Sequence, residues 1–249
     1  AEGEESAASE DEGGFTAPVI DPQRNMKRTK GPQRPPNAGL PNFSRKHNLL
    51  FVHIPKTAGT ALIEQLDFPY HPGHATAKDL MGAFNAHPTA TSFAVIRNPW
   101  SRVVSNYMYC RMTESYWHGK GGGSKHPHPD WNLCHGHDFG EYVRTLEKAW
   151  DGVNAAPGAP FKHPWGLDAQ WKYVCSHDPH KRVLVKKLLR FENLAADLQE
   201  LIPGFELARV NASPASQRDY REFYTEELKE IVARVYAEDI RVFGFTFDN

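Results

Sequence analysis

The stretch LLFVHIPKTAGT, residues 49–60, decides the fold of this chain. Its four leading apolar residues are typical of a short buried strand, and the small residues that follow are typical of a tight turn. We expect a helix from Thr60 to Leu66, because Leu62, Ile63 and Leu66 fall on one helical face. A strand that passes through such a turn into a helix is the first half of an α/β unit.

A second unit of the same kind begins with the apolar run FAVI, residues 93–96. This strand stops at Arg97, after which Asn98 is suited to cap a helix and Pro99 to occupy its first turn. We expect that helix to run to about Arg111.

The rest of the chain continues this alternation. Residues 183–189 indicate another strand, and helical patterns cover 139–150 and 193–201. The last helix is the clearest, with Thr225 as its cap. Its apolar face is formed by Leu228, Ile231, Val232, Val235 and Ile240. The fold class is therefore α/β, and we expect a parallel sheet with helices on both faces.

The first 46 residues differ in composition from the rest. Residues 1–14 carry six acidic side chains and no basic one, whereas residues 24–46 carry seven basic side chains and no acidic one. With few large apolar residues, such a segment cannot bury enough surface to fold. We expect 1–46 to be a disordered tail, or a stem that spaces the domain, residues 47–249, from an upstream anchor.

The composition is that of a soluble globular protein without a strong global charge. The chain has 249 residues, with 29 basic and 30 acidic side chains, so the net charge favours neither nucleic acid nor a membrane surface as a partner. It also weighs mildly against a densely anionic acceptor. No apolar run reaches the roughly 18 residues of a membrane-spanning helix. The oligomeric state is left open.

The turn after the first strand has the features of an anion site. Its backbone N–H groups converge at the start of a helix, whose dipole favours negative charge. Lys56 adds a full positive charge, and the hydroxyls of Thr57 and Thr60 are further donors. In the common nucleotide P-loop the lysine follows the glycines, whereas here it precedes Gly59. The alternative is an ordinary strand–turn–helix with a surface lysine.

A second anion site is indicated after the second strand. Arg97 lies at the strand end, and Ser105 lies two turns into the next helix, on the same face as Ser101. A guanidinium fork and a hydroxyl that converge on one point suit a phosphate group. The alternative is that Arg97 pairs with a nearby acid and that Ser105 only packs.

The segment from Pro55 to Thr60 resembles the 5′-phosphosulfate loop of the sulfotransferase superfamily, and residues 97–107 resemble its 3′-phosphate motif. The likeness is closest to the carbohydrate branch that includes heparan sulfate 2-O-sulfotransferase, and it covers about residues 49–247. It implies a three-layer, P-loop-like fold and transfer of a sulfuryl group from 3′-phosphoadenosine 5′-phosphosulfate (PAPS) to a hydroxyl, with PAP as product and no metal. The cofactor-binding residues that it implies are Lys56, Thr57, Ala58, Gly59, Thr60, Ala61, Arg97 and Ser105.

The same resemblance implies a histidine base. The branch has a two-histidine segment after the first helix, where this chain has His71 and His74, with two residues between them instead of one. We predict that His74 is the catalytic base and that Lys56 is the catalytic cation. His71 and Glu64 are the alternatives for the base.

A histidine-rich stretch, residues 117–138, is expected to be a long surface loop that binds the acceptor. Cys134, His135 and His137 offer three ligand atoms without a clear fourth, so we expect no metal there. Cys110 and Cys134 are the nearest cysteines in sequence, and the sequence is equally compatible with a disulfide and with two buried thiols.

The sequence leaves the acceptor and the compartment open. The branch resemblance favours a carbohydrate hydroxyl and the Golgi lumen. A small-molecule alcohol as acceptor, a cytoplasmic location and a nucleotide-binding protein without catalysis are the alternatives. Asn42-Phe43-Ser44 is a glycosylation sequon, which is usable only in a secreted or luminal protein.

Overall fold

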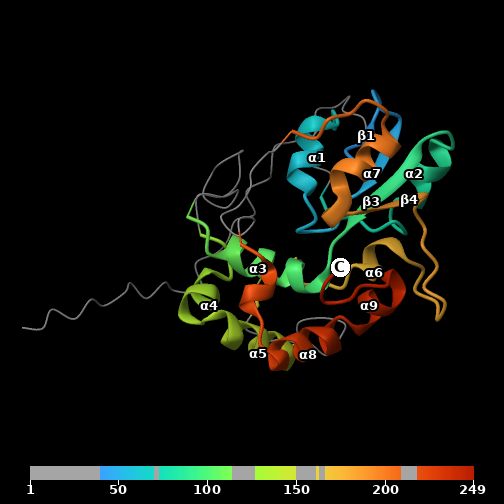
Figure 1. Ribbon diagram of the computed structural model, residues 1–249. Coiled ribbons are helices and arrows are strands. Elements are labelled where there is room, and N and C mark those ends of the chain that lie inside the picture. The colour runs from blue at the N-terminus through green and yellow to red at the C-terminus, as the bar shows by residue number, and fades with distance from the viewer. Residues whose placement is uncertain (1–39, 70–72, 114–126, 150–160, 163–165, 209–217) are drawn as a thin grey trace, which may run out of the picture. The chain divides into compact units, whose positions relative to one another are not determined.

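Four strands form the central sheet of the computed structural model, in the order β1-β2-β3-β4. The structure describes residues 40–69, 73–113, 127–149, 161–162, 166–208 and 218–249, all of which belong to one compact unit. The strands are β1 (Phe43–Ser44), β2 (Leu49–Val52), β3 (Thr91–Ile96) and β4 (Lys187–Arg190). Helices lie on both sides of this sheet (Figure 1), and the predicted α/β class with a flanked central sheet is confirmed.

The pairing of the strands brings three carboxyl ends to one edge. β2 pairs with β3 in parallel, with Phe51 opposite Phe93, and β3 pairs with β4 in parallel, with Val95 opposite Leu189. β1 is antiparallel to β2. Ligands of open parallel sheets bind at the carboxyl edge, so the segments that leave β2, β3 and β4 are where a site is expected.

Side chains alternate between two apolar cores, one on each face of the sheet. On one face, Phe51, Phe93 and Leu189 pack against α1 (Gly59–Gln65) and α7 (Leu194–Leu201). Leu62 of α1, Leu198 of α7 and Leu66, which follows α1, are fully buried there. The alternation follows from the two-residue period of a strand, which directs successive side chains to opposite faces.

The second face carries the larger core. Val52, Ala94 and Ile96 point into it, and most of the remaining helices contribute to it. They are α2 (Met81–Ala86), α3 (Pro99–Cys110), α4 (Trp131–Gly136), α5 (Phe139–Ala149), α6 (Trp171–Val174), α8 (Glu226–Val235) and α9 (Ala237–Phe243). Short 3-10 helices lie at Phe191–Asn193 and Tyr220–Phe223. None of the helices in the described part of the chain is long and apolar enough to cross a membrane.

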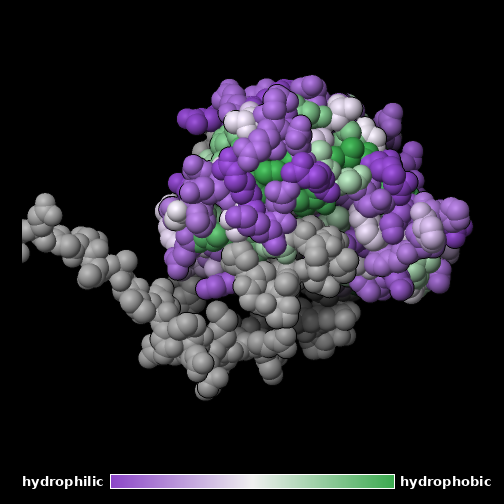
Figure 2. Space-filling model, turned by 90° about the horizontal axis from the view of Figure 1, so that it is seen from below, coloured by the Kyte–Doolittle hydropathy of each residue, from purple (hydrophilic) through white to green (hydrophobic). Residues whose placement is uncertain are grey.

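The surface of the described residues is mainly polar on the face shown in Figure 2. Among these residues, the large hydrophobic side chains that are exposed are Met81 and Val183. Most large apolar side chains of the described residues are therefore buried in the two cores.

The structure departs from the sequence expectations at both ends of the domain. β1 lies inside residues 1–46, for which we expected disorder, because the Asn42 side chain bonds the carbonyl of Phe51 at 2.7 Å and ties this segment to β2. Asn42 is only 2% exposed, so its sequon is not accessible to glycosylation in the folded domain. Residues 1–39 lie outside the described residues.

The expected last helix is two helices, broken at Tyr236, whose hydroxyl donates to the Leu167 carbonyl at 2.7 Å.

Three helices escaped the sequence analysis: α2, α4 and the four-residue α6. α4 lies inside residues 117–138, which we expected to form a loop throughout; residues 117–126 are outside the described part. α2 was not expected, because its six residues show no clear apolar period. The strand expected over 183–189 corresponds to β4, which begins only at Lys187. Val183 forms an isolated bridge with Cys175 instead.

Asn98 connects the start of α3 with the carboxyl terminus of the chain. Its side-chain oxygen accepts the backbone N–H groups of Trp100 and Ser101, as expected of a cap, and Pro99 is the first helical residue. Its amide nitrogen donates to the carbonyl of Thr246 at 2.8 Å and also to that of Asn249. One buried side chain thus fixes both the exit from β3 and the last residues.

We expect Asn98→Ala to lower the free energy of unfolding by about 2–4 kcal/mol, because a helix cap and two further hydrogen bonds are lost together. Thr225→Ala removes the exposed cap of α8 alone and should cost about 1 kcal/mol. Denaturant unfolding followed by circular dichroism measures both. Equal losses in the two variants would contradict the linking role of Asn98.

Candidate functional site

The turn between β2 and α1 has a strained backbone. Lys56 and Ala58 both have a φ of 69°, in the left-handed region that residues other than glycine rarely adopt. Such a conformation costs on the order of 1–2 kcal/mol per residue, and it persists only where the surroundings impose it. Alternation of right- and left-handed residues turns successive N–H groups to one side, which makes a concave site for an anion.

Two side chains hold this turn from behind. The Thr57 hydroxyl donates to the Ile54 carbonyl at 2.8 Å, and Arg102 Nε donates to the Pro55 carbonyl at 3.0 Å. Arg102 is 2% exposed and also donates to the Asp168 carbonyl at 2.7 Å. Sequence analysis missed Arg102, although its place beside Val103 on the apolar stripe of α3 was a signal. The Thr57 hydroxyl therefore supports the turn, whereas the sequence predicted that it would be a donor to the bound anion.

Gly59 allows a close contact that no other residue would. A Cβ at this position would lie 1.8 Å from His53 Nε2, far inside van der Waals contact. His53 is the first residue after β2 and is 4% exposed. Its ring therefore fills the space under the turn, and the absence of a side chain at Gly59 is a packing requirement.

Lys56 is half-buried at the mouth of this turn. Its Nζ lies 3.5 Å from the centroid of the Tyr109 ring, which comes from α3. Burial, together with the nearby guanidiniums of Arg97 and Arg102, lowers the pKa of Lys56 to about 7. An anion beside this ammonium would restore its charge, because an opposite charge favours the protonated form.

Arg97 lies directly beside the turn. Its Nη1 donates to the Lys56 carbonyl at 3.2 Å, and its Nε donates to Ser101 Oγ at 2.9 Å. The guanidinium stacks on the Phe191 ring at 3.9 Å. Burial lowers the pKa of Arg97 to about 10, so the side chain stays charged at neutral pH. The two predicted anion sites are therefore adjacent, at the ends of neighbouring strands.

The other expected cofactor residues differ in how they are placed. Ser101, rather than Ser105, contacts the Arg97 side chain; Ser105 is half-buried one turn further along α3. Thr60 is exposed and Ala61 is half-buried in the first turn of α1. Ala58 is half-buried and Gly59 is buried.

Gln170 fixes the backbone at Arg97. Its side chain accepts the Arg97 N–H and donates to the Arg97 carbonyl, each at 2.8 Å. Asp239 of α9 accepts the backbone N–H groups of Gln170 and Trp171, also at 2.8 Å. Sequence analysis missed both residues, since they lie about 70 positions away from each other.

His74 lies beside His53, with the two ring centroids 4.4 Å apart. Its Nδ1 is 3.1 Å from the His53 carbonyl oxygen. Because a carbonyl only accepts, Nδ1 carries the proton and the basic lone pair is on Nε2. His53 thus connects the turn with the predicted base. Glu64 is exposed on α1, and His71 lies outside the described residues.

Cys134, His135 and His137, the potential ligands noted in the sequence, do not converge on one point. Cys134 is buried, His135 stacks on Trp131 at 3.7 Å, and His137 Nδ1 lies 3.3 Å from Glu141. Among the residues that the structure describes, the group able to hold a metal is instead Cys110, His128 and Asp130.

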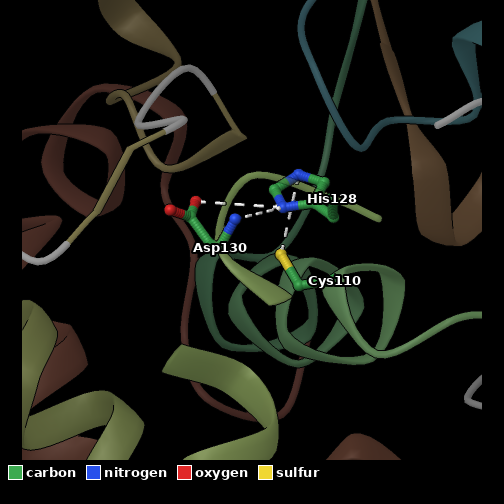
Figure 3. A group of neighbouring side chains, drawn as sticks. All are labelled: Cys110, His128 and Asp130. Atoms are coloured by element: carbon green, nitrogen blue, oxygen red, sulfur yellow. Dashed lines mark hydrogen bonds and ion pairs between the residues drawn. The ribbon is translucent and has the colours of Figure 1, made fainter. Parts of the chain in front are cut away.

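This group, shown in Figure 3, is held by hydrogen bonds. The Asp130 N–H donates to His128 Nδ1 at 3.1 Å, and the Asp130 carboxylate accepts the Lys162 N–H at 2.5 Å. His128 Nε2 lies 3.8 Å from Cys110 Sγ. Cys110 and Cys134 are free thiols and do not form a disulfide. A hydrogen bond to Cys134 and burial both raise the pKa of Cys110.

Comparison with known proteins decides the family. A family model described as the sulfotransferase family matches residues 42–246. The chain belongs to the sulfotransferase family. The match begins just before β1, which agrees with the ordered segment found there. The protein is thus an enzyme that transfers sulfuryl groups, and the described turn belongs to its catalytic domain. Searches of curated proteins and of solved structures found no match to this sulfotransferase.

We expect Gly59→Ala to lower the free energy of unfolding by about 1–3 kcal/mol, because the new methyl group overlaps the His53 ring. Gly82→Ala, in α2, meets nothing within 4 Å and should be neutral or stabilising by about 0.5–1 kcal/mol. Thermal and denaturant unfolding of the two variants gives the comparison. A stable Gly59→Ala protein would show that the turn is not packed on His53.

Proposed function

We propose that this sulfotransferase is PAPS-dependent and transfers the sulfuryl group to a hydroxyl of a carbohydrate. The observation that carries the proposal is the hydrogen bond from Arg97 Nη1 to the Lys56 carbonyl, 3.2 Å long, which places the Arg97 guanidinium against the turn that carries Lys56, at one sheet edge. A nucleotide with phosphates at both its 5′ and 3′ positions has the charges to match two such adjacent cations.

Each part of the donor has a matching partner. The concave turn and Lys56 suit the 5′-phosphosulfate, while Arg97 and the serines of α3 suit the 3′-phosphate. ATP lacks a phosphate at the 3′ position, so Arg97 would gain nothing from it. The adjacency therefore favours PAPS over ATP as the donor.

In the proposed reaction, the acceptor oxygen attacks the sulfur of PAPS in line. The S–O bond to the 5′-phosphate breaks as the new S–O bond forms, and its electron pair leaves with PAP. Lys56 stabilises the negative charge that builds on this phosphate oxygen. His74 Nε2 takes the hydroxyl proton, and the resulting imidazolium keeps its Nδ1–H on the His53 carbonyl.

Support for the carbohydrate acceptor comes from the likeness of the chain, foremost its Pro55–Thr60 loop, to the carbohydrate branch that includes 2-O-sulfotransferase. The same likeness supports the Golgi lumen as the proposed compartment, where glycans meet PAPS.

Transfer of label from PAPS tests the proposal. The protein is incubated with sulfur-labelled PAPS, glycans and small alcohols, with and without EDTA. We expect label on a glycan hydroxyl despite EDTA. Label only on small alcohols would reject the carbohydrate acceptor, and PAP binding without transfer to any acceptor would reject PAPS-dependent catalysis.

We expect His74→Ala to reduce kcat by about 10²–10⁴-fold, the contribution of a general base. The matched control is His180→Ala, which removes an exposed histidine on the segment between α6 and β4. Steady-state rates with saturating PAPS measure both. A near-normal rate in His74→Ala would assign the base elsewhere.

PAP binding should weaken as the pH rises from 7 to 9, because Lys56, whose pKa is about 7, is charged below that value and neutral above it. In this range the phosphates of PAP are already ionised, since their second pKa is near 6. Lys56→Ala should bind weakly with little pH dependence, whereas Arg97→Ala should bind weakly and keep the dependence. Calorimetric titration at several pH values measures this. A pH dependence that survives in Lys56→Ala would contradict the assignment.

A further inference from the structure

We propose that Tyr109 is a positioning residue for Lys56: its ring face holds the ammonium at the place where the leaving phosphate develops charge. The proposal rests on the function proposed above. It gives a role to the buried Cys110–His128–Asp130 cluster, which neither the motifs nor the family match explains.

The contact between the two side chains is close. Lys56 Nζ lies 3.5 Å from the Tyr109 ring centroid, well within the roughly 6 Å at which a ring face attracts a cation. A lysine side chain has four rotatable bonds, and its ammonium would otherwise sample many positions. The ring selects one of them, so less conformational freedom is lost when the donor binds.

The Tyr109 ring is itself held in place by the cluster in Figure 3. The His128 ring packs edge-on against it, with centroids 5.6 Å apart and an interplanar angle of 80°. His128 in turn is fixed by the Asp130 N–H at 3.1 Å on one nitrogen and by Cys110 Sγ at 3.8 Å on the other. Both His128 and Asp130 are almost fully buried. These buried contacts therefore restrict the orientation of the Tyr109 ring.

The surroundings of Lys56 disfavour its protonated form, and the Tyr109 ring face counteracts this effect. Burial disfavours its charged form, as do Arg97 and Arg102. The negative face of an aromatic ring favours the cation without adding a net charge that would repel the donor. Tyr109 thus offsets part of the cost of keeping Lys56 protonated before PAPS arrives.

Two substitutions separate the ring face from the hydroxyl. Tyr109→Phe keeps the face, and Tyr109→Leu removes it. We expect Tyr109→Phe to match the wild type and Tyr109→Leu to lose about 2- to 30-fold in kcat/KM for PAPS, the range that cation–π energies imply. Most of the loss should be in kcat, because charge builds on the phosphate in the transition state.

The pH profile gives a readout that general damage to the fold would not move. Loss of the ring lowers the Lys56 pKa, so the alkaline limb of kcat/KM should shift to lower pH in Tyr109→Leu and stay in place in Tyr109→Phe. Lys181→Ala removes a surface cation–π pair with Trp171, 3.8 Å long, and should change neither the rate nor the profile.

A spectroscopic measurement keeps this proposal separate from the proposed function. In protein labelled with ¹³Cε-lysine, the Lys56 resonance is assigned by its loss in Lys56→Arg. Ring current should shift its Hε protons upfield in the wild type and in Tyr109→Phe, but not in Tyr109→Leu. An unchanged Lys56 resonance in a folded Tyr109→Leu protein would overturn the proposal even if PAPS is the donor; failure of PAPS turnover with the upfield shift intact would reject only the proposed function.

Discussion

The parallel pairing of β2 with β3 is the constraint on which the site depends. It places the carboxyl ends of two strands side by side, so the segments that follow leave the sheet at the same edge. The Arg97 side chain, at the end of β3, then donates a hydrogen bond to the Lys56 carbonyl in the turn after β2. Arg102, five residues later, donates to the Pro55 carbonyl of the same turn. One sheet register thereby brings three cations to a single turn.

Three like charges so close together require compensation, and the structure supplies it by backbone and aromatic groups. Arg97 lies on Phe191, Lys56 lies on Tyr109, and Arg102 donates to two carbonyls. The Glu192 carboxylate also favours the charged form of Arg97, so ring faces, carbonyl oxygens and a carboxylate together offset the burial of these cations. Cations held in this way at one sheet edge suit the binding of an anionic group.

The cores explain why this edge is rigid. Each strand contributes side chains alternately to two apolar layers, so β2 and β3 cannot slip without moving buried residues to the wrong face. Asn98 and the Asp239–Gln170 pair tie the exit of β3 to α9 and the last residues. The C-terminal segment is therefore a support for the site, although it lies far from the turn in sequence.

Strand period, turn composition and caps are local properties, so the sequence alone was enough to place β2, β3 and the helix start at Asn98 and to single out Lys56 and Arg97 as separate candidate anion-binding residues. It could not give Arg102, Gln170, Tyr109 or His53 their places, since each acts through a contact between distant segments. The sequence also gave no sign of β1, which has only two residues and is held by the Asn42 side chain. The break at Tyr236 likewise depends on a hydrogen bond to Leu167 across the core. Local pattern fixes which elements form; only packing decides which side chains meet.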